Sequence, residues 1–435
     1  MYRPWVQWHV STDSQLDMIF LTIASDVIAK RIKRMFFFHG VMVMVFLFGA
    51  NVEKWVNIQM ERKRISTTEL RKQNRNQVFR IIYDADGPLT KQEIAQRLHM
   101  SLPTVTQNLK ELFDENILTD AGADESTGGR KARLIKLNKN VYFSVGIELS
   151  PKHIRFIAIN LKAEELAYEK LEYPFSNTPE YRMVYAKKLE EFLDRFGFSR
   201  ERLLGVGITM PGIINEQEGI VEIAPVLQLH HMKLSLLTEV IPYPVYVQND
   251  ASAGGVAEWW NYDGPSAMAY VFLGKGVGGA LMIDGKPFEG LNRRSAEFGH
   301  MCIHPGGKNC NCGRQGCFES YCSSSVLSDD LGMDIKDFFQ RLEEKDPYYI
   351  EIWDTYVSHL VTAIHNIHMV LDCEIVIGGI LTPYLEDYMP MIRKRLKEKS
   401  FFPDEERYIH LGRCQGKANC IGVALHFIAD FLEQI

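Results

Sequence analysis

The sequence lacks an excess of positive charge, any short tandem repeat and any low-complexity tract. Its 435 residues carry a formal net charge of −6 at pH 7, which argues against a surface coated throughout by nucleic acid. One basic module remains compatible with that balance. From Glu61 to Asn138, 14 Lys/Arg stand against 11 Asp/Glu, so this segment is net positive in front of an acidic body. The length predicts two to three domains.

A secretory signal and a full-length membrane-spanning run are also missing. The apolar run from Met35 to Ala50 follows a basic stretch, Lys30–Arg34, but is shorter than the ~20 residues that a spanning helix needs. It also begins too far along the chain for a signal peptide. A signal anchor is one interpretation. The other, which we favour, is that residues 1–59 are a non-native extension and that translation begins at Met60, so no membrane association is expected.

The eight cysteines do not suggest a disulfide framework. Five of them lie between Cys302 and Cys322, and no secretory signal precedes them. In a large protein this distribution indicates a reduced compartment, the cytoplasm, and a metal site.

The segment 60–138 reads as a winged helix-turn-helix domain. A helix is expected over Asn74–Asp84, and Gly87-Pro88 ends it. Thr90 and Glu93 form a capping box for a short second helix. Ser101 caps a third helix, Leu102–Asn116, and two short strands, Ile117–Leu118 and Arg133–Leu137, flank a polar loop that forms the wing.

The third helix is the expected recognition helix. Its exposed side chains would reach base edges and phosphates, and the thin basic wing would contact phosphates or a minor groove. A small protein-interaction module with solvated charges is the alternative. The predicted DNA-binding residues are Ser101, Pro103, Thr104, Thr106, Gln107, Lys110, Arg130 and Lys131.

Beyond Asn138 short apolar strands alternate with helical stretches, which predicts an α/β body. We divide it into a first lobe, residues 139–254, and a second lobe, residues 255–435. The expected strands are Phe143–Leu149, Ile154–Asn160, Leu204–Thr209, Tyr246–Gln248, Ala267–Leu273 and Ile375–Ile377, and the clearest helices are Tyr181–Phe196 and Ile352–Leu371.

Between Gly299 and Cys317 the residues are typical of a zinc knuckle. Three thiolates and one imidazole, His300, Cys310, Cys312 and Cys317, make a tetrahedral set with no open position, so the expected zinc ion is structural. Gly313 and Gly316 permit the bend that brings Cys317 round. Cys302 and His304 are competing ligands of lower rank.

Polar residues in apolar surroundings suggest a ligand site. Asn249 and Asp250 follow a strand directly, at the end where α/β folds bind ligands. Glu297 and Glu319 flank the knuckle, and such carboxylates suit sugar hydroxyls, although each alone could be a cap or a surface charge. Glycine-rich turns at Gly205–Gly212, Gly274–Gly279 and Gly378–Gly379 would let backbone amides approach a phosphate or sugar.

From Met60 to Ile435 the chain resembles the ROK family of sugar repressors and sugar kinases. The similarity rests on the Asn249-Asp250 pair, Glu297-x-x-His300, the three knuckle cysteines and Glu319. It implies a two-lobed actin-like ATPase (ribonuclease H-like) fold with sugar in the interlobe cleft. It also implies sugar contacts from Asn249, Asp250, Glu297, His300 and Glu319, with His300 shared with zinc and Asp250 the base in a kinase.

One stretch departs from the kinase pattern. Kinase members carry Asp-x-Gly-Gly-Thr at the first strand turn, whereas here Glu148 replaces Asp, Ser150-Pro151 replaces the two glycines and Lys152 replaces Thr. Pro151 removes an amide donor and fixes φ, which disfavours a phosphate cradle. Lys275 also stands where kinase members usually have a small hydroxyl residue.

The sequence therefore predicts a non-catalytic, sugar-responsive repressor of carbohydrate-utilisation genes. It would bind a pseudo-palindromic operator as a homodimer or homotetramer, with a sugar or sugar phosphate as effector. The alternative is an ATP-dependent sugar kinase, of glucokinase or N-acetylhexosamine kinase type, with an appended DNA-binding domain. A corepressor-like partner that docks other proteins is a third class.

Overall fold

The computed structural model of the protein describes residues 67–123, 132–262, 266–402 and 407–435. Within these ranges no helix is both long and apolar enough to cross a lipid bilayer. The apolar run from Met35 to Ala50, and with it the question of an anchor or a non-native extension, lies outside the described residues, as do Arg130 and Lys131 of the wing.

The first folded segment is a winged helix. Its elements are α3 (Thr67–Tyr83), β1 (Leu89–Thr90), α4 (Lys91–Arg97), α5 (Leu102–Asp114), β2 (Leu118–Ala123) and β3 (Arg133–Leu137). The capping box is confirmed, because Glu93 N donates to Thr90 Oγ1 at 3.2 Å and Thr90 N donates to Glu93 Oε2 at 2.7 Å. Ser101 caps α5 as predicted. The two-residue strand β1, which pairs with β3, was not predicted.

The first lobe is built on a five-stranded sheet in the order β11-β7-β4-β5-β6. Strands β4, β7 and β11 are parallel, whereas β5 and β6 continue the sheet antiparallel. A second small sheet, β10-β9-β8, follows β7. The elements are β4 (Phe143–Leu149), β5 (His153–Asn160), β6 (Glu165–Glu172), α6 (Pro179–Arg195), β7 (Leu203–Met210), β8 (Ile213–Asn215), β9 (Ile220–Ala224), β10 (Leu229–Lys233), α7 (Ser235–Thr238) and β11 (Val245–Asn249).

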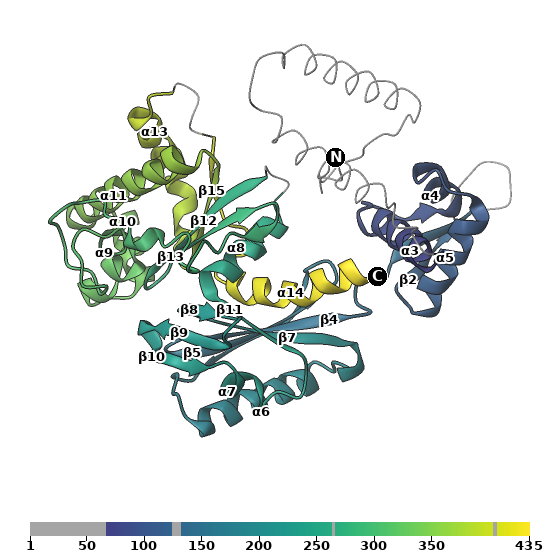
Figure 1. Ribbon diagram of the computed structural model, residues 1–435. Helices are drawn as coiled ribbons and strands as arrows, with labels where there is room; N and C mark the ends of the chain where they lie inside the picture. The colour runs from purple at the N-terminus through teal and green to yellow at the C-terminus, as the bar shows by residue number, and fades with distance from the viewer. Residues whose placement is uncertain (1–66, 124–131, 263–265, 403–406) are drawn as a thin grey trace, which may run out of the picture. The chain divides into compact units, whose positions relative to one another are not determined.

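The second lobe is built on a five-stranded sheet in the order β14-β13-β12-β15-β16. Its strands β12, β13 and β15 are labelled in Figure 1. Helix α8 precedes the sheet, and the described helices α9 to α13 belong to the same half of the body. The elements are α8 (Asp250–Trp260), β12 (Ala267–Leu273), β13 (Val277–Ile283), β14 (Lys286–Pro287), α9 (Glu319–Cys322), α10 (Ile335–Glu343), α11 (Pro347–Leu371), β15 (Glu374–Gly379), α12 (Thr382–Leu385), α13 (Met389–Lys399) and β16 (Ile409–Leu411). All six predicted strands of the α/β body are confirmed to within two residues at either end.

The last helix, α14 (Ala418–Gln434), returns to the first sheet and packs on β4, β5 and β7, and also on α8 (Figure 1). This contact corrects the interpretation of Gly205 and Gly207 as a ligand-facing turn. Both lie inside β7, and a Cβ on Gly207 would come within 2.4 Å of Val423 O in α14. Glycine there permits close helix packing, and the bend itself falls at Gly212, where φ is 124°.

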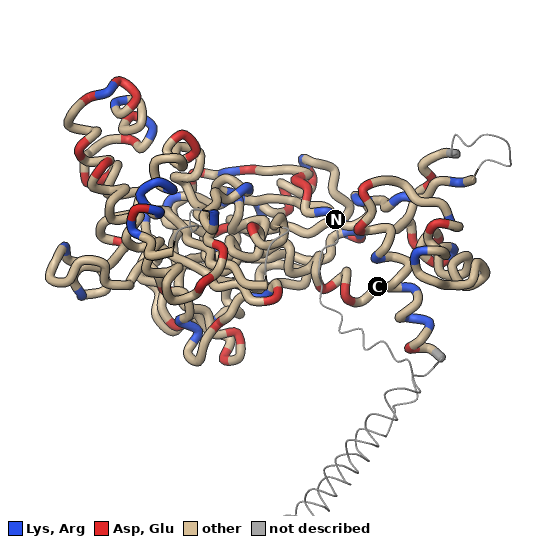
Figure 2. The backbone as a smooth tube through the Cα atoms, turned by 90° about the horizontal axis from the view of Figure 1, so that it is seen from above, with Lys and Arg blue, Asp and Glu red and all other residues tan. Residues whose placement is uncertain are grey.

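Acidic and basic residues are interspersed along the described backbone (Figure 2). The apolar core forms one large cluster in each lobe and a third that joins the winged helix to residues of β5, α8 and α14. In the winged helix Val78, Ile94, Val105 and Leu112 are fully buried. Burial of such side chains is the main force that holds each layer together.

Candidate functional site

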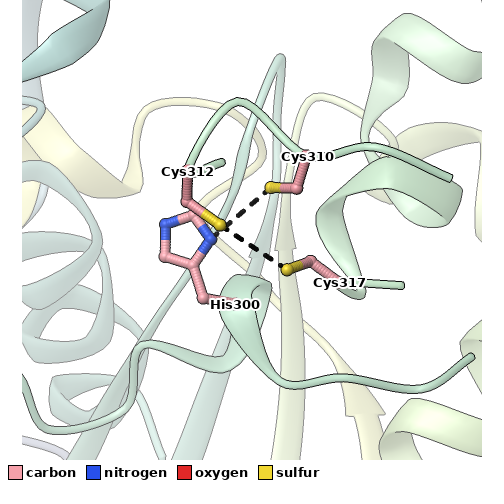
Figure 3. Close-up of side chains that lie close together, drawn as sticks. All are labelled: His300, Cys310, Cys312 and Cys317. Atoms are coloured by element: carbon pink, nitrogen blue, oxygen red, sulfur yellow. Dashed lines mark hydrogen bonds between the residues drawn. The ribbon is translucent and has the colours of Figure 1, made fainter. Parts of the chain in front are cut away.

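Four side chains converge in the segment after β14. His300 ends a short 3₁₀ turn, Phe298–His300, and the three cysteines come from the loop before α9 (Figure 3). Cys310 Sγ lies 3.8 Å from His300 Nδ1, and Cys312 Sγ lies 3.7 Å from Cys317 Sγ. All four candidate ligand atoms lie within 4.8 Å of one another.

This geometry fits a zinc ion. Tetrahedral Zn–S bonds of about 2.3 Å place neighbouring sulfur atoms roughly 3.8 Å apart, close to the separation observed. The donor set of three sulfurs and one imidazole nitrogen is that of closed structural zinc sites. With Nδ1 turned toward the sulfurs, Nε2 of His300 is the ring nitrogen left for a ligand.

The loop reaches this geometry through two residues with positive φ. Gly313 has φ 81° and Gly316 has φ 82°. A Cβ on Gly316 would lie 1.9 Å from His304 O, so only glycine fits there. The tight turn is closed by Gly313 N, which donates to Cys310 O at 2.9 Å, and by Cys310 N, which donates to Arg314 O at 2.8 Å.

The thiols differ in their electrostatic surroundings. Burial raises the pKa of Cys317 to about 12, whereas a hydrogen bond from the backbone N–H of Arg314 lowers the pKa of Cys312. Cys310 and Cys317 are buried. Buried thiolates need a cation to be stable, and a divalent metal ion would supply that charge.

The two lower-ranked ligands lie apart from this group. Cys302 is exposed, and its Sγ faces Gln315 O at 3.8 Å. The ring of His304 stacks on Tyr321 with centroids 5.8 Å apart. The four-residue group does not include either of them.

The carboxylates that flank the knuckle lie near it. Glu319 Oε2 accepts a hydrogen bond from Val277 N at 2.9 Å, and its Oε1 lies 4.0 Å from Cys310 Sγ. Glu319 therefore ties the knuckle to the start of β13. Partial removal from water raises the pKa of Glu297, and the nearby His300 opposes that shift.

Asn249 and Asp250 form the junction between β11 and α8. Asn249 Oδ1 accepts from Ser252 N at 2.9 Å as the N-cap of α8, and its Nδ2 donates to Gly212 O at 2.9 Å. Its amide thus has a structural role, whatever else it contacts. Burial, followed by the negative charges of Glu148 and Glu297, raises the pKa of Asp250 to about 7. Asp250 therefore lies within electrostatic range of the Glu297 carboxylate.

On the predicted recognition helix the candidate side chains lie on the outside. Thr104 is half-buried, and its N–H is capped by Ser101 Oγ at 3.3 Å. Sequence reasoning missed Asn108, which is buried and donates to Thr104 O at 2.8 Å. The exposed members are Ser101, Pro103, Thr106, Gln107 and Lys110.

Another residue that was missed is Arg155, which forms an ion pair with Glu148 at 2.8 Å in the β4–β5 hairpin. The register of the two predicted strands contains the signal, because a hairpin that pairs Leu149 with Ile154 also pairs Glu148 with Arg155. A cavity of about 150 Å³ lies elsewhere, lined by Glu258, Arg393, His410 and their neighbours, and no predicted sugar-binding residue lines it.

Comparison with known proteins places the chain in a family. Residues 144–427 match the ROK family, and residues 72–119 match a winged helix-turn-helix DNA-binding family. The xylose repressor of Caldicellulosiruptor bescii is 29% identical over 265 residues, which cover 60% of this chain and 66% of that protein. The DNA-binding transcriptional dual regulator NagC of Escherichia coli is 25% identical over 272 residues, 61% of this chain and 66% of NagC.

Solved structures give the same fold. A ROK family transcriptional regulator, a homologue of the Escherichia coli MLC protein, superposes with a TM-score of 0.67 at 21% identity, covering 83% of this chain and 98% of that chain. A ROK family glucokinase from Streptomyces griseus gives a TM-score of 0.57 at 22% identity, covering 65% and 98%. The expected two-lobed kinase-type fold behind a winged helix is thereby confirmed. Because the ROK match spans well over half of the chain, the protein belongs to the ROK family and carries a winged helix-turn-helix domain ahead of the ROK module.

Proposed function

We propose that this protein is a sugar-responsive transcriptional repressor of carbohydrate-utilisation genes, acting in the cytoplasm. The observation that carries the proposal is the winged helix-turn-helix domain, with a capped α5 and an exposed polar face, in front of a ROK module. Relatives named xylose repressor and NagC support the same function.

The DNA-binding part of the proposal assigns base and phosphate contacts to α5. The exposed side chains of Thr106, Gln107 and Lys110 have the hydrogen-bonding groups that read base edges or neutralise phosphates. Arg130 and Lys131 of the wing would add phosphate contacts. A homodimer or homotetramer would place two such helices on the half-sites of a pseudo-palindromic operator.

The effector part of the proposal assigns a sugar or sugar phosphate to the region between α8 and the knuckle. Asn249, Asp250, Glu297 and Glu319, with Nε2 of His300, would accept and donate hydrogen bonds to sugar hydroxyls. Zinc held by His300, Cys310, Cys312 and Cys317 would supply a fixed crosslink beside these groups. Sugar binding can change operator affinity only as far as it favours one of the two conformational states.

We also propose that the module does not transfer phosphate. The turn between β4 and β5 is closed by its own hydrogen bonds: the backbone N–H and the hydroxyl of Ser150 both donate to His153 O, at 3.1 and 2.9 Å. Pro151 has no N–H to offer, so this turn presents few donors to a nucleotide. The family also includes kinases such as the Streptomyces griseus glucokinase, so phosphotransfer is the second candidate function.

Two assays on the full chain test the proposal. In a gel shift with DNA upstream of the chain's own operon, the protein should retard the fragment, and one of xylose, N-acetylglucosamine or its 6-phosphate should change the half-saturation point. In a coupled assay with ATP and the same sugars, no sugar-dependent ADP release is expected. Robust ADP release would establish a kinase instead, and the absence of any shift at low salt would favour a protein-docking role.

A further inference from the structure

The β4–β5 hairpin contains a buried ion pair that the proposed function does not use. Glu148 and Arg155 lie opposite each other in antiparallel register. Arg155 Nη1 donates to both carboxylate oxygens of Glu148, at 3.0 and 2.8 Å. Their side chains are only 15% and 8% exposed, so water screens this pair weakly.

The ion pair lies at the ligand-binding edge of the first sheet. Across the parallel strands the register aligns Glu148 of β4 with Thr209 of β7 and Gln248 of β11. Asp250 follows two residues beyond Gln248. In α/β folds, ligands bind at the carboxyl ends of parallel strands, which is where this row lies.

Two buried polar atoms at this edge have unused hydrogen-bonding capacity. Thr209 is fully buried, and among the described residues its Oγ1 has no hydrogen-bond partner; the same holds for Nε of Arg155. Buried polar groups are normally satisfied, so such atoms indicate a place built to meet a ligand or solvent. The negative charge of Glu148 also helps to raise the pKa of Asp250 to about 7, which places the two carboxylates within electrostatic range.

Two carboxylates and a hydroxyl are the oxygen ligands that hard divalent cations prefer. Here a permanently charged side chain already provides the positive charge, since an arginine does not lose its proton in a protein. We propose that Arg155 is a specificity-determining residue: its guanidinium binds both carboxylate oxygens of Glu148, so that Glu148 cannot join Asp250 in holding a divalent metal ion with its phosphate ligands. The inference rests on the proposed function, because it explains why this member of a family with kinases would bind sugar without metal nucleotide.

The test uses Mn²⁺ as the probe and the zinc-loaded full chain, with binding measured by titration calorimetry. The parent protein and Arg155→Lys, which keeps a positive charge, should show no Mn²⁺ site that depends on Asp250. Arg155→Met removes the charge but keeps a similar side-chain length. We expect this variant to bind one Mn²⁺ at least about tenfold more tightly than the parent does, a difference in binding free energy of about 1.4 kcal/mol. The double variant Arg155→Met/Asp250→Asn should lose that site.

Removal of one partner of a buried ion pair can destabilise the fold. Arg155→Gln, which can still donate a hydrogen bond to Glu148, is therefore tested in parallel, and cooperative thermal unfolding identifies folded variants. The inference is overturned if a folded Arg155→Met or Arg155→Gln binds Mn²⁺ no better than the parent. It is equally overturned if the parent already has an Asp250-dependent Mn²⁺ site, a result that needs no variant of Arg155 to fold.

Operator and sugar binding are measured on the same samples. If the parent binds neither operator nor sugar, the proposed function is refuted, but the Mn²⁺ result can still be interpreted. Normal operator and sugar binding, combined with an unchanged Mn²⁺ affinity in the variants, would refute only the role of Arg155.

Discussion

Asp250 lies at the start of α8, where its ionised carboxylate destabilises the folded protein. Its pKa rises from 3.8 to about 7, chiefly because the carboxyl group is buried. The folded state therefore binds a proton more tightly than the unfolded state, and stability falls as pH rises from about 4 to about 7. Above pH 7 this loss of stability stays constant.

Asp250→Asn removes this titration and keeps an oxygen that can accept from Ala251 N, as Asp250 does at 2.9 Å. We expect the free energy of unfolding of the variant to exceed that of the parent by on the order of 1–2 kcal/mol at pH 8 and by much less at pH 5. Each unit of pKa shift corresponds to about 1.4 kcal/mol before solvent screening reduces it. Thermal unfolding at both pH values measures the gain. A Tm difference that does not change with pH would show that Asp250 does not titrate as inferred.

A second prediction at the residue scale concerns the knuckle. Cys312→Ser removes one of four soft ligands, so we expect zinc loss together with loss of the sugar response, because Glu319 contacts both Cys310 and Val277. Metal analysis and the gel shift measure the two effects. Cys302→Ser is the matched control, since Cys302 is exposed and lies outside the ligand group. If zinc is lost while the sugar response persists, the knuckle does not support the sugar site.

At the scale of elements, local signals predicted most of the fold. Capping at Thr90 and Ser101 acts within one helical turn, so the helix starts were accessible from sequence. The small sheet β8–β10 and strand β6 were not predicted. The residues of β6, Glu165–Glu172, are mixed in burial, and strands of this kind are set by cross-strand neighbours.

The contacts of α14 could not be predicted for a related reason. They join residues more than 150 positions apart, and no local periodicity encodes them. The candidate site shows the same difference. The knuckle ligands lie close together in the sequence and can be predicted from it, whereas the approach of Glu148 to Asp250 depends on strand order and cannot. In the sequence alone Gly205 and Gly207 resemble a ligand turn, whereas in the structure they make room for the distant helix α14.

The α8–α14 contact supports a prediction at this scale. A Cβ on Gly422 would lie 1.6 Å from Ala253 O, a backbone atom in α8 that cannot move alone. Gly422→Ala should improve helix propensity by about 1 kcal/mol, yet overpacking should cost more than that, so we expect net destabilisation of about 1–3 kcal/mol in urea unfolding. Gly87→Ala is the control, because a Cβ there meets nothing within 4 Å. An unchanged or higher midpoint for Gly422→Ala would contradict the packing described.

At the scale of the whole molecule, a regulator needs contacts whose strength differs between its states. One candidate joins the two lobes: Arg293, in the segment after β14, donates through Nη1 to Asn215 Oδ1 in β8. Glu289 holds the same guanidinium at 3.2 Å from Nε. Arg293 has a positive φ of 54°, an uncommon conformation for a residue with a side chain.

In the proposed site a sugar would lie between Asn249, at the end of β11 in the first lobe, and the knuckle of the second lobe. It would therefore contact both lobes, and a hydrogen bond between the lobes would contribute to the free energy of their closure. If the Arg293–Asn215 hydrogen bond forms mainly in the closed state, Arg293→Ala should raise the half-maximal sugar concentration by roughly 5- to 10-fold, the effect of about 1–1.4 kcal/mol. Operator affinity without sugar should change little. Sugar titrations of the gel shift measure both quantities, and Lys394→Ala, which removes an exposed lysine paired with Glu398 in α13, is the control. An unchanged sugar midpoint in Arg293→Ala would mean that this contact is equally strong in both states, because a contact that does not differ between states cannot shift their populations.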